Sequence, residues 1–95
     1  MSALESVKVA LRTTTTDDNL VSQMNNLIDA CIADLQSANI KVEKDENGNY
    51  QPLILNAICQ YVKAYFLNGN ITEMYLRSYE SMKTHLSLLE EYKNE

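Results

Sequence analysis

The sequence predicts an all-α fold, a small four-helix bundle, and three observations lead to it. Apolar residues recur at helical spacing in every long segment, most clearly around Met24, Leu27 and Cys31. The chain holds only 2 glycines and 1 proline among its 95 residues, so it has few signals for turns. Its apolar fraction of 45% is that of an ordinary globular protein, and its length suits one domain over residues 1–95.

The first predicted helix covers residues 3–11. Ser2 and Glu5 match a capping box, in which each side chain satisfies a free backbone N–H at the helix start. The apolar stripe of this helix is formed by Leu4, Val7 and Leu11. The helix should end at residues 13–16, because four consecutive threonines are poor helix formers.

The second predicted helix begins at Asp17 or Asp18 and ends near Ala38. An acidic residue at the start caps free N–H groups and suits the positive end of the helix dipole. Polar residues follow from position 39 to 51, and they include Asn47-Gly48, a signal for a type I′ turn. The connection is therefore either a polar loop or a short hairpin.

The third predicted helix opens at Pro52 and runs to about Asn68, with Gly69 as its left-handed stop. Its polar positions form one narrow stripe, made of Asn56, Gln60 and Lys63. A helix that is apolar on almost every side must be covered on almost every side. Three short partner helices can hardly do this, so we expect a second chain to contribute.

The fourth predicted helix runs from about Thr72 to Glu90, with Asn70 and Glu73 as a weak capping pair. Its apolar seam has spacings of four and three, which suits packing along another helix, and consists of Tyr75, Tyr79, Met82, Leu86 and Leu89. In the bundle as a whole, we expect the second, third and fourth helices to pack around the first.

Aromatic residues of the third and fourth helices are the candidate oligomer interface, because tyrosine is enriched where proteins meet. The candidates are Tyr61, Tyr65, Phe66, Tyr75 and Tyr79. The alternative is that these rings pack in the core with their hydroxyls at its rim.

The segment 87–95 is a candidate flexible tail. Three glutamates, Glu90, Glu91 and Glu95, crowd the negative end of the fourth helix, so its last turns should fray. The frayed residues carry apolar side chains that suit binding to a partner, namely Leu88, Leu89 and Tyr92. The alternative is that Leu89 and Tyr92 cover the open end of the bundle.

No set of residues predicts catalysis, a cofactor or a metal site. Cys31 and Cys59 lie on apolar helix faces without C-x-x-C spacing, so we expect two free thiols. A zinc site needs about four ligands, and His85 is the only histidine. Ser78 and Ser81 stand near His85 in sequence, but serines are common on exposed helix faces. We therefore predict that the protein is not an enzyme.

The formal charge is −5, from 8 basic and 13 acidic residues. This sign repels phosphate backbones, so sequence-specific nucleic-acid binding is not expected, and neither is docking on an anionic membrane. No segment approaches the about 20 apolar residues of a membrane span. The N-terminal stretch has no signal-peptide core, so we expect synthesis in the cytosol.

Several stretches resemble one family, the small head–tail connector (adaptor) proteins of tailed bacteriophages. LESVKVALR and TTDDNLVSQMNNLIDACIADLQSANI resemble the family's short first helix and its longer, D-D-capped second helix. PLILNAICQYVKAYF is similar to its apolar third helix, and YESMKTHLSLLEEY resembles its tail in phages and prophages of Gram-positive bacteria. Family members often have Gly directly after the Phe that ends the third helix, whereas Leu67, Asn68 and Gly69 follow Phe66 here. The loop 43–50 is also longer and more polar than usual in the family.

The resemblance implies a subunit that assembles into a twelvefold ring beneath the portal protein and extends the DNA channel toward the tail. Its other partner would be a stopper or tail-completion protein, and DNA would pass through without sequence-specific binding. The candidate tail with Leu88, Leu89 and Tyr92 would reach toward the portal. The implied location is the head–tail joint of the virion, after synthesis in the host cytoplasm. The alternative function is a generic small helical protein-binding regulator.

Overall fold

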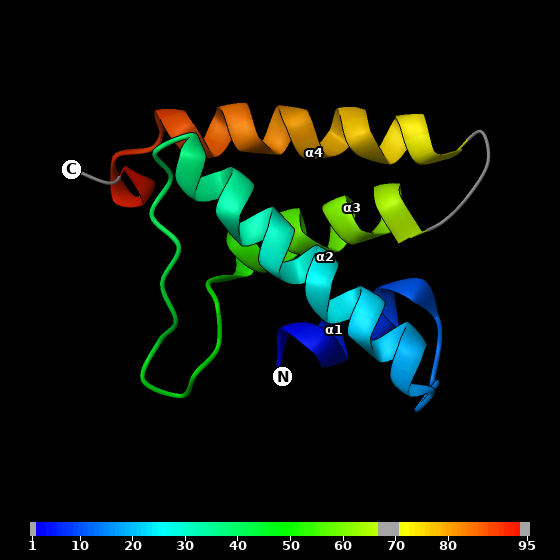
Figure 1. Ribbon diagram of the computed structural model, residues 1–95. Coiled ribbons are helices and arrows are strands. Elements are labelled where there is room, and N and C mark those ends of the chain that lie inside the picture. Colours follow the sequence, from blue (N-terminus) through cyan, green and yellow to red (C-terminus); the bar gives the residue numbers. More distant parts are fainter. Residues whose placement is uncertain (1, 67–70, 94–95) are drawn as a thin grey trace.

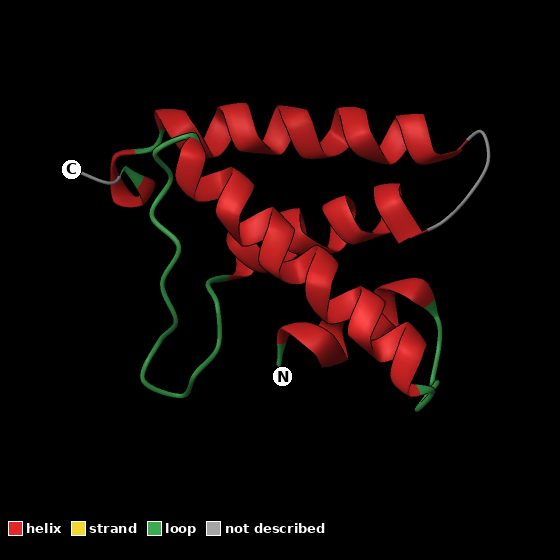
Figure 2. Ribbon diagram, in the orientation of Figure 1, coloured by secondary structure: helices red, strands yellow, loops and turns green. Residues whose placement is uncertain are grey.

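A computed structural model describes residues 2–66 and 71–93, and these residues form helices without any strand (Figure 1, Figure 2). The predicted all-α fold is confirmed. The elements are α1 (Ala3–Leu11), α2 (Asp18–Ser37), α3 (Pro52–Phe66), α4 (Ile71–Leu88) and a short 3₁₀ helix, η1 (Glu90–Tyr92). The expected helix stop at Gly69 and the cap at Asn70 lie outside the described residues.

The predicted N-caps of α1 and α2 are present. The hydroxyl of Ser2 accepts a hydrogen bond from the backbone N–H of Glu5 at 3.1 Å. One carboxylate oxygen of Asp17 accepts from the N–H groups of Asn19 and Leu20 at 2.9 and 3.1 Å. Each cap satisfies donors that the first helical turn leaves without partners, which explains why the helices begin where the sequence predicted.

The central helix is α3, because it packs against α1, α2 and α4 (Figure 1). The expectation that the first helix is the centre is wrong. The helix α1 has nine residues and buries only Val7 completely, whereas α3 buries Ile54, Ala57, Ile58, Val62 and Ala64. A helix that is apolar almost all round takes the central position, since only there do neighbours cover several of its faces. The three partner helices bury these five residues of α3, while Leu53 and Tyr65 stay exposed.

All four helices, the α2–α3 connection and η1 contribute to a single core. Its buried members are Val7, Met24, Ile28, Cys31, Leu35, Ile40, Ile54, Ala57, Ile58, Val62, Tyr79, Leu86 and Tyr92. The inward seam predicted for the fourth helix is present at Tyr79 and Leu86, which are each 1% exposed. The helical periodicity in the sequence therefore identifies the buried faces correctly.

The α2–α3 connection contains a minimal hairpin. Lys44 and Tyr50 form an isolated antiparallel bridge, and the N–H of Asp45 donates to the carbonyl of Asn49 at 2.7 Å. The N–H of Gly48 donates to the carbonyl of Asp45 at 2.9 Å. The hairpin alternative is thus present in its shortest form, between two polar stretches.

The turn in this hairpin is not of type I′. A type I′ turn needs positive φ at both central residues, but only Gly48 has it, at 81°, and Asn47 does not. The carboxylate of Asp45 accepts hydrogen bonds from the N–H groups of Asn47 and Asn49, at 2.8 and 3.0 Å. This side chain organises a three-residue turn in which glycine alone occupies the left-handed region.

Candidate interaction surfaces

Three of the candidate aromatic residues form one cluster between α3 and α4. The ring centroids of Tyr61 and Tyr65 are 4.6 Å apart, and those of Tyr61 and Tyr79 are 5.0 Å apart with an edge-to-face angle of 72°. Both distances lie in the range preferred by aromatic pairs. The structure therefore brings together Tyr61, Tyr65 and Tyr79.

Tyr79 is the buried anchor of this cluster and not a surface residue. Its ring is 1% exposed, and its hydroxyl donates a hydrogen bond to the Asp34 carboxylate at 2.5 Å. The ammonium of Lys83 lies 3.1 Å from the same carboxylate oxygen. Tyr79 thus joins α4 to α2 within one subunit, which is the position that the core-packing alternative describes.

The electrostatics of this site favour an ionised Asp34. Partial burial opposes the charged form, but the hydrogen bonds from Tyr79 and Lys83 outweigh it and hold the pKa of Asp34 below its ordinary value. Burial and the bond to Asp34 raise the pKa of Tyr79. Burial also raises the pKa of the nearby Cys31 thiol to about 12, so this thiol stays protonated and is a poor nucleophile at neutral pH.

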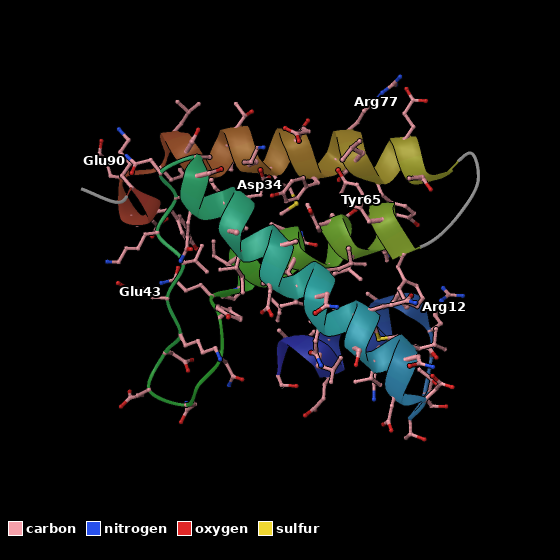
Figure 3. The ribbon with its side chains drawn as sticks, in the orientation of Figure 1. Arg12, Asp34, Glu43, Tyr65, Arg77 and Glu90 are labelled. Carbon is pink, nitrogen blue, oxygen red and sulfur yellow. The ribbon has the colours of Figure 1, made fainter. Side chains whose placement is uncertain are left out.

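The other aromatic candidates differ in how much of each ring reaches the surface. Tyr65, at the end of α3, is 53% exposed (Figure 3). Tyr61, Phe66 and Tyr75 are half-buried, and the Lys63 ammonium lies 5.0 Å from the ring centroid of Tyr75. Of the five candidates, Tyr65 alone offers more than half of its surface to a partner.

A groove of about 390 Å³ runs between α3 and α4, and we call it the α3/α4 groove. It is lined by Leu53, Asn56, Ser78, Ser81, Met82, His85 and Leu86. The structure thus brings Ser78, Ser81 and His85 to one place, as a hydrolase would require. The described lining includes no carboxylate, the group that orients the histidine in a Ser-His-Asp triad.

The flank of α4 that borders the α3/α4 groove carries a second row of residues at helical spacing, which the sequence analysis did not single out. It consists of Met74, Ser78, Ser81, His85 and Leu88, and we call it the outer stripe. All five are exposed, with Met74 at 56% and Leu88 at 70%. Its spacing of four and three equals that of the inward seam. Apolar periodicity does not identify it, because the residues between Met74 and Leu88 are polar.

The candidate tail residues separate into an exposed leucine and a buried anchor. Leu88 is 70% exposed, whereas Tyr92 is 5% exposed and belongs to the core. The backbone N–H of Lys41 donates to the carbonyl of Tyr92 at 2.6 Å, and Ile40 forms an antiparallel bridge with Lys93. The structure therefore corresponds to the alternative in which the tail covers the end of the bundle.

In residues 2–66 and 71–93, no three histidine, cysteine, aspartate or glutamate side chains are grouped as metal ligands would be. Within the same residues, no helix combines the length and the apolar character needed to cross a membrane.

Comparison with known proteins identifies one family. Residues 3–93 match the family model described as "Phage connector protein". No curated protein and no solved structure matches the chain. The matched region includes all four helices and η1.

Proposed function

Since the chain belongs to the phage connector protein family, we propose that it is a structural head–tail connector subunit of a tailed bacteriophage. In this role it forms a ring beneath the portal protein, extends the DNA channel and provides the attachment site for the tail. The observation that carries the proposal is the family match over residues 3–93, because a match of this extent includes every helix of the bundle.

The charge of the protein supports a channel through which DNA passes. A formal charge of −5 repels phosphates, so a ring of such subunits does not hold the DNA by non-specific binding. The proposed ring has twelvefold symmetry, and its partners are the portal protein on one side and a stopper or tail-completion protein on the other. Its place is the head–tail joint of the virion, and its role is mechanical rather than enzymatic.

Exposed apolar side chains support association through α3 and α4. Six large apolar residues are exposed in the described part of the chain, and four of them lie on these two helices, namely Leu53, Tyr65, Met74 and Leu88. Exposed apolar residues of this kind are candidates for contacts between proteins. We assign ring contacts to these exposed residues of α3 and α4, and contact with the portal to Leu88.

The test is assembly with the portal protein of the same phage. Light scattering should detect a complex with several copies of the chain per portal, and negative-stain microscopy should show a ring on one face of the portal. A generic helical regulator would instead bind a single partner and form no ring. A phage in which this gene is disrupted should produce filled heads without tails. Heads that carry tails in its absence would refute the proposal.

A further inference from the structure

We propose that Asn47 is a site of spontaneous deamidation, which the folded turn of the α2–α3 connection holds back and which proceeds when that turn opens. The reactants are the Asn47 side chain, the backbone nitrogen of Gly48 and water, so the modification needs no partner protein and no cofactor. The inference concerns the single chain and does not depend on its assembly with other copies.

The reaction exchanges the side-chain amide of Asn47 for a carboxylate. The deprotonated backbone nitrogen of Gly48 attacks the side-chain carbonyl carbon of Asn47, the bond from that carbon to the amide nitrogen breaks, and ammonia leaves with the proton that Gly48 lost. A five-membered succinimide remains, and one water molecule opens it at either of its two carbonyl carbons. The products are aspartate, with the backbone unchanged, and isoaspartate, in which the backbone runs through the former side chain.

The tip of the hairpin leaves room for this reaction. Gly48 has no side chain to shield its backbone nitrogen, and beyond its two chain neighbours no heavy atom lies within 4 Å of the place where a Cβ would stand. Asn47 and Gly48 are both exposed, so water reaches the succinimide. The surroundings of the pair therefore do not block the attack by crowding.

The hydrogen bonds of the folded turn oppose the attack. The N–H of Gly48 donates to the carbonyl of Asp45 at 2.9 Å, so the proton that must leave is engaged and the nitrogen is directed toward Asp45. The N–H groups of Asn47 and Asn49 both donate to the carboxylate of Asp45, at 2.8 and 3.0 Å, and they fix the backbone on either side of Gly48. The reaction therefore waits for a local opening of the turn.

Isoaspartate at position 47 disrupts the hairpin. It adds one carbon atom to the backbone between the Cα of residue 47 and the nitrogen of Gly48, whereas the turn that places Lys44 opposite Tyr50 has a fixed length. From this connection, Val42 and Tyr50 pack against the core. The modification thus loosens the cover that the connection gives to the bundle.

Peptide mapping by mass spectrometry tests the site, on protein kept in mildly alkaline buffer with or without guanidinium chloride. We expect Asn47 to deamidate about tenfold more slowly in the native protein, because the hydrogen bonds of the turn must break first. The mapping separates Asn47 from Asn68, the other asparagine that glycine follows. An unmodified Asn47 in denaturant would show that it is no deamidation site, and equal rates in both buffers would show that the turn gives no protection.

Two variants separate the turn from global unfolding. Asp45→Ala removes the acceptor of two hydrogen bonds of the turn, so the native rate at Asn47 should rise severalfold while circular dichroism shows unchanged helices. Glu46→Ala, at the exposed neighbouring position, is the matched control and should leave the rate unchanged. A native rate that Asp45→Ala does not alter, or that both variants raise equally, would overturn the protective role of the turn.

Discussion

At the scale of single residues, the contact between Tyr79 and Asp34 is one that neighbouring residues in the sequence do not predict. The capping roles of Ser2 and Asp17 follow from residue type and position alone, because a cap involves neighbours in sequence. Tyr79 and Asp34 are 45 residues apart, and their hydrogen bond depends on how α2 and α4 are placed around α3. No local pattern encodes that placement, so the sequence alone leaves Tyr79 open between an interface and the core.

Removal of the Tyr79 hydroxyl should therefore destabilise the subunit without changing its fold. A hydrogen bond to a charged group contributes roughly 1.5–3 kcal/mol, so Tyr79→Phe should lower the free energy of unfolding by about 1–2 kcal/mol, since Lys83 still pairs with Asp34. Urea denaturation measures this change. Tyr65→Phe, at a ring that is 53% exposed, is the control and should have little effect. Equal losses in the two variants would contradict the role of the hydrogen bond.

The same site predicts how stability depends on pH. The pKa of Asp34 is lower in the folded protein than its ordinary value, so between these two values the unfolded chain binds more protons. The contribution of Asp34 is then fully present above the unfolded pKa of about 3.9 and is lost as the pH falls through the folded pKa. Asp34→Asn should flatten the acid side of a plot of unfolding free energy against pH. Asp29→Asn, at an exposed position on the same helix, should leave that plot unchanged.

At the scale of elements, helix boundaries were predictable but neighbours were not. Caps and periodicity located α1 and α2 within one residue of their observed ends, and Pro52 marks the start of α3. Periodicity tells which face of a helix is buried, but it does not tell which element covers that face. For this reason the central role of α3 and the burial of Tyr92 appear only in the structure.

The buried ring of Tyr92 should make the tail essential for stability. Replacement of a buried aromatic residue by alanine costs roughly 3–5 kcal/mol in protein cores, and we expect about 3 kcal/mol for Tyr92→Ala at the edge of this one. Truncation after Ser87 should have a larger effect, because it also removes the half-buried Leu89. Thermal melting followed by circular dichroism measures both. An unchanged melting temperature would show that the tail is detached in solution.

Leu88 should behave in the opposite way. Its side chain is 70% exposed, so Leu88→Asp should leave the melting temperature unchanged within a few degrees. If Leu88 contacts the portal, the same change should weaken binding at least tenfold in a titration with portal protein. Ser22→Asp, at an exposed position of α2, controls for the added charge. Normal binding by Leu88→Asp would remove this residue from the proposed contact.

At the scale of the whole molecule, the fold is flat. Its extents along the three principal axes are 39 × 33 × 17 Å, so the shortest is less than half of the longest. A flat bundle leaves the outer surfaces of its helices without cover, as the outer stripe of α4 shows. The family and the fold class could be recognised from the sequence because both depend on the order of helices. The exposed surfaces could not, because polar residues within the outer stripe conceal its helical repeat.

Charges on the exposed surface should separate assembly from folding. Tyr65→Asp combined with Met74→Asp places two carboxylates at positions that are more than half exposed. The isolated subunit should keep its helicity and melting temperature, while light scattering should show no ring on the portal. Gln36→Asp combined with Ser22→Asp, both exposed on α2, is the matched control and should assemble. Rings formed by the Tyr65 and Met74 variant would exclude these two residues from the contact.

The buried thiol of Cys31 gives the protein a built-in measure of how often its helices move apart. Cys31 is 0% exposed, and with its pKa raised to about 12 it reacts with an alkylating reagent only when the helices around it separate. In a chain with Cys59→Ala, which removes the other free thiol, the rate of its labelling in native buffer therefore reports how often the helices around Cys31 separate. When subunits join a larger assembly, slower labelling of this one sulfur would measure how strongly the neighbours hold the bundle closed.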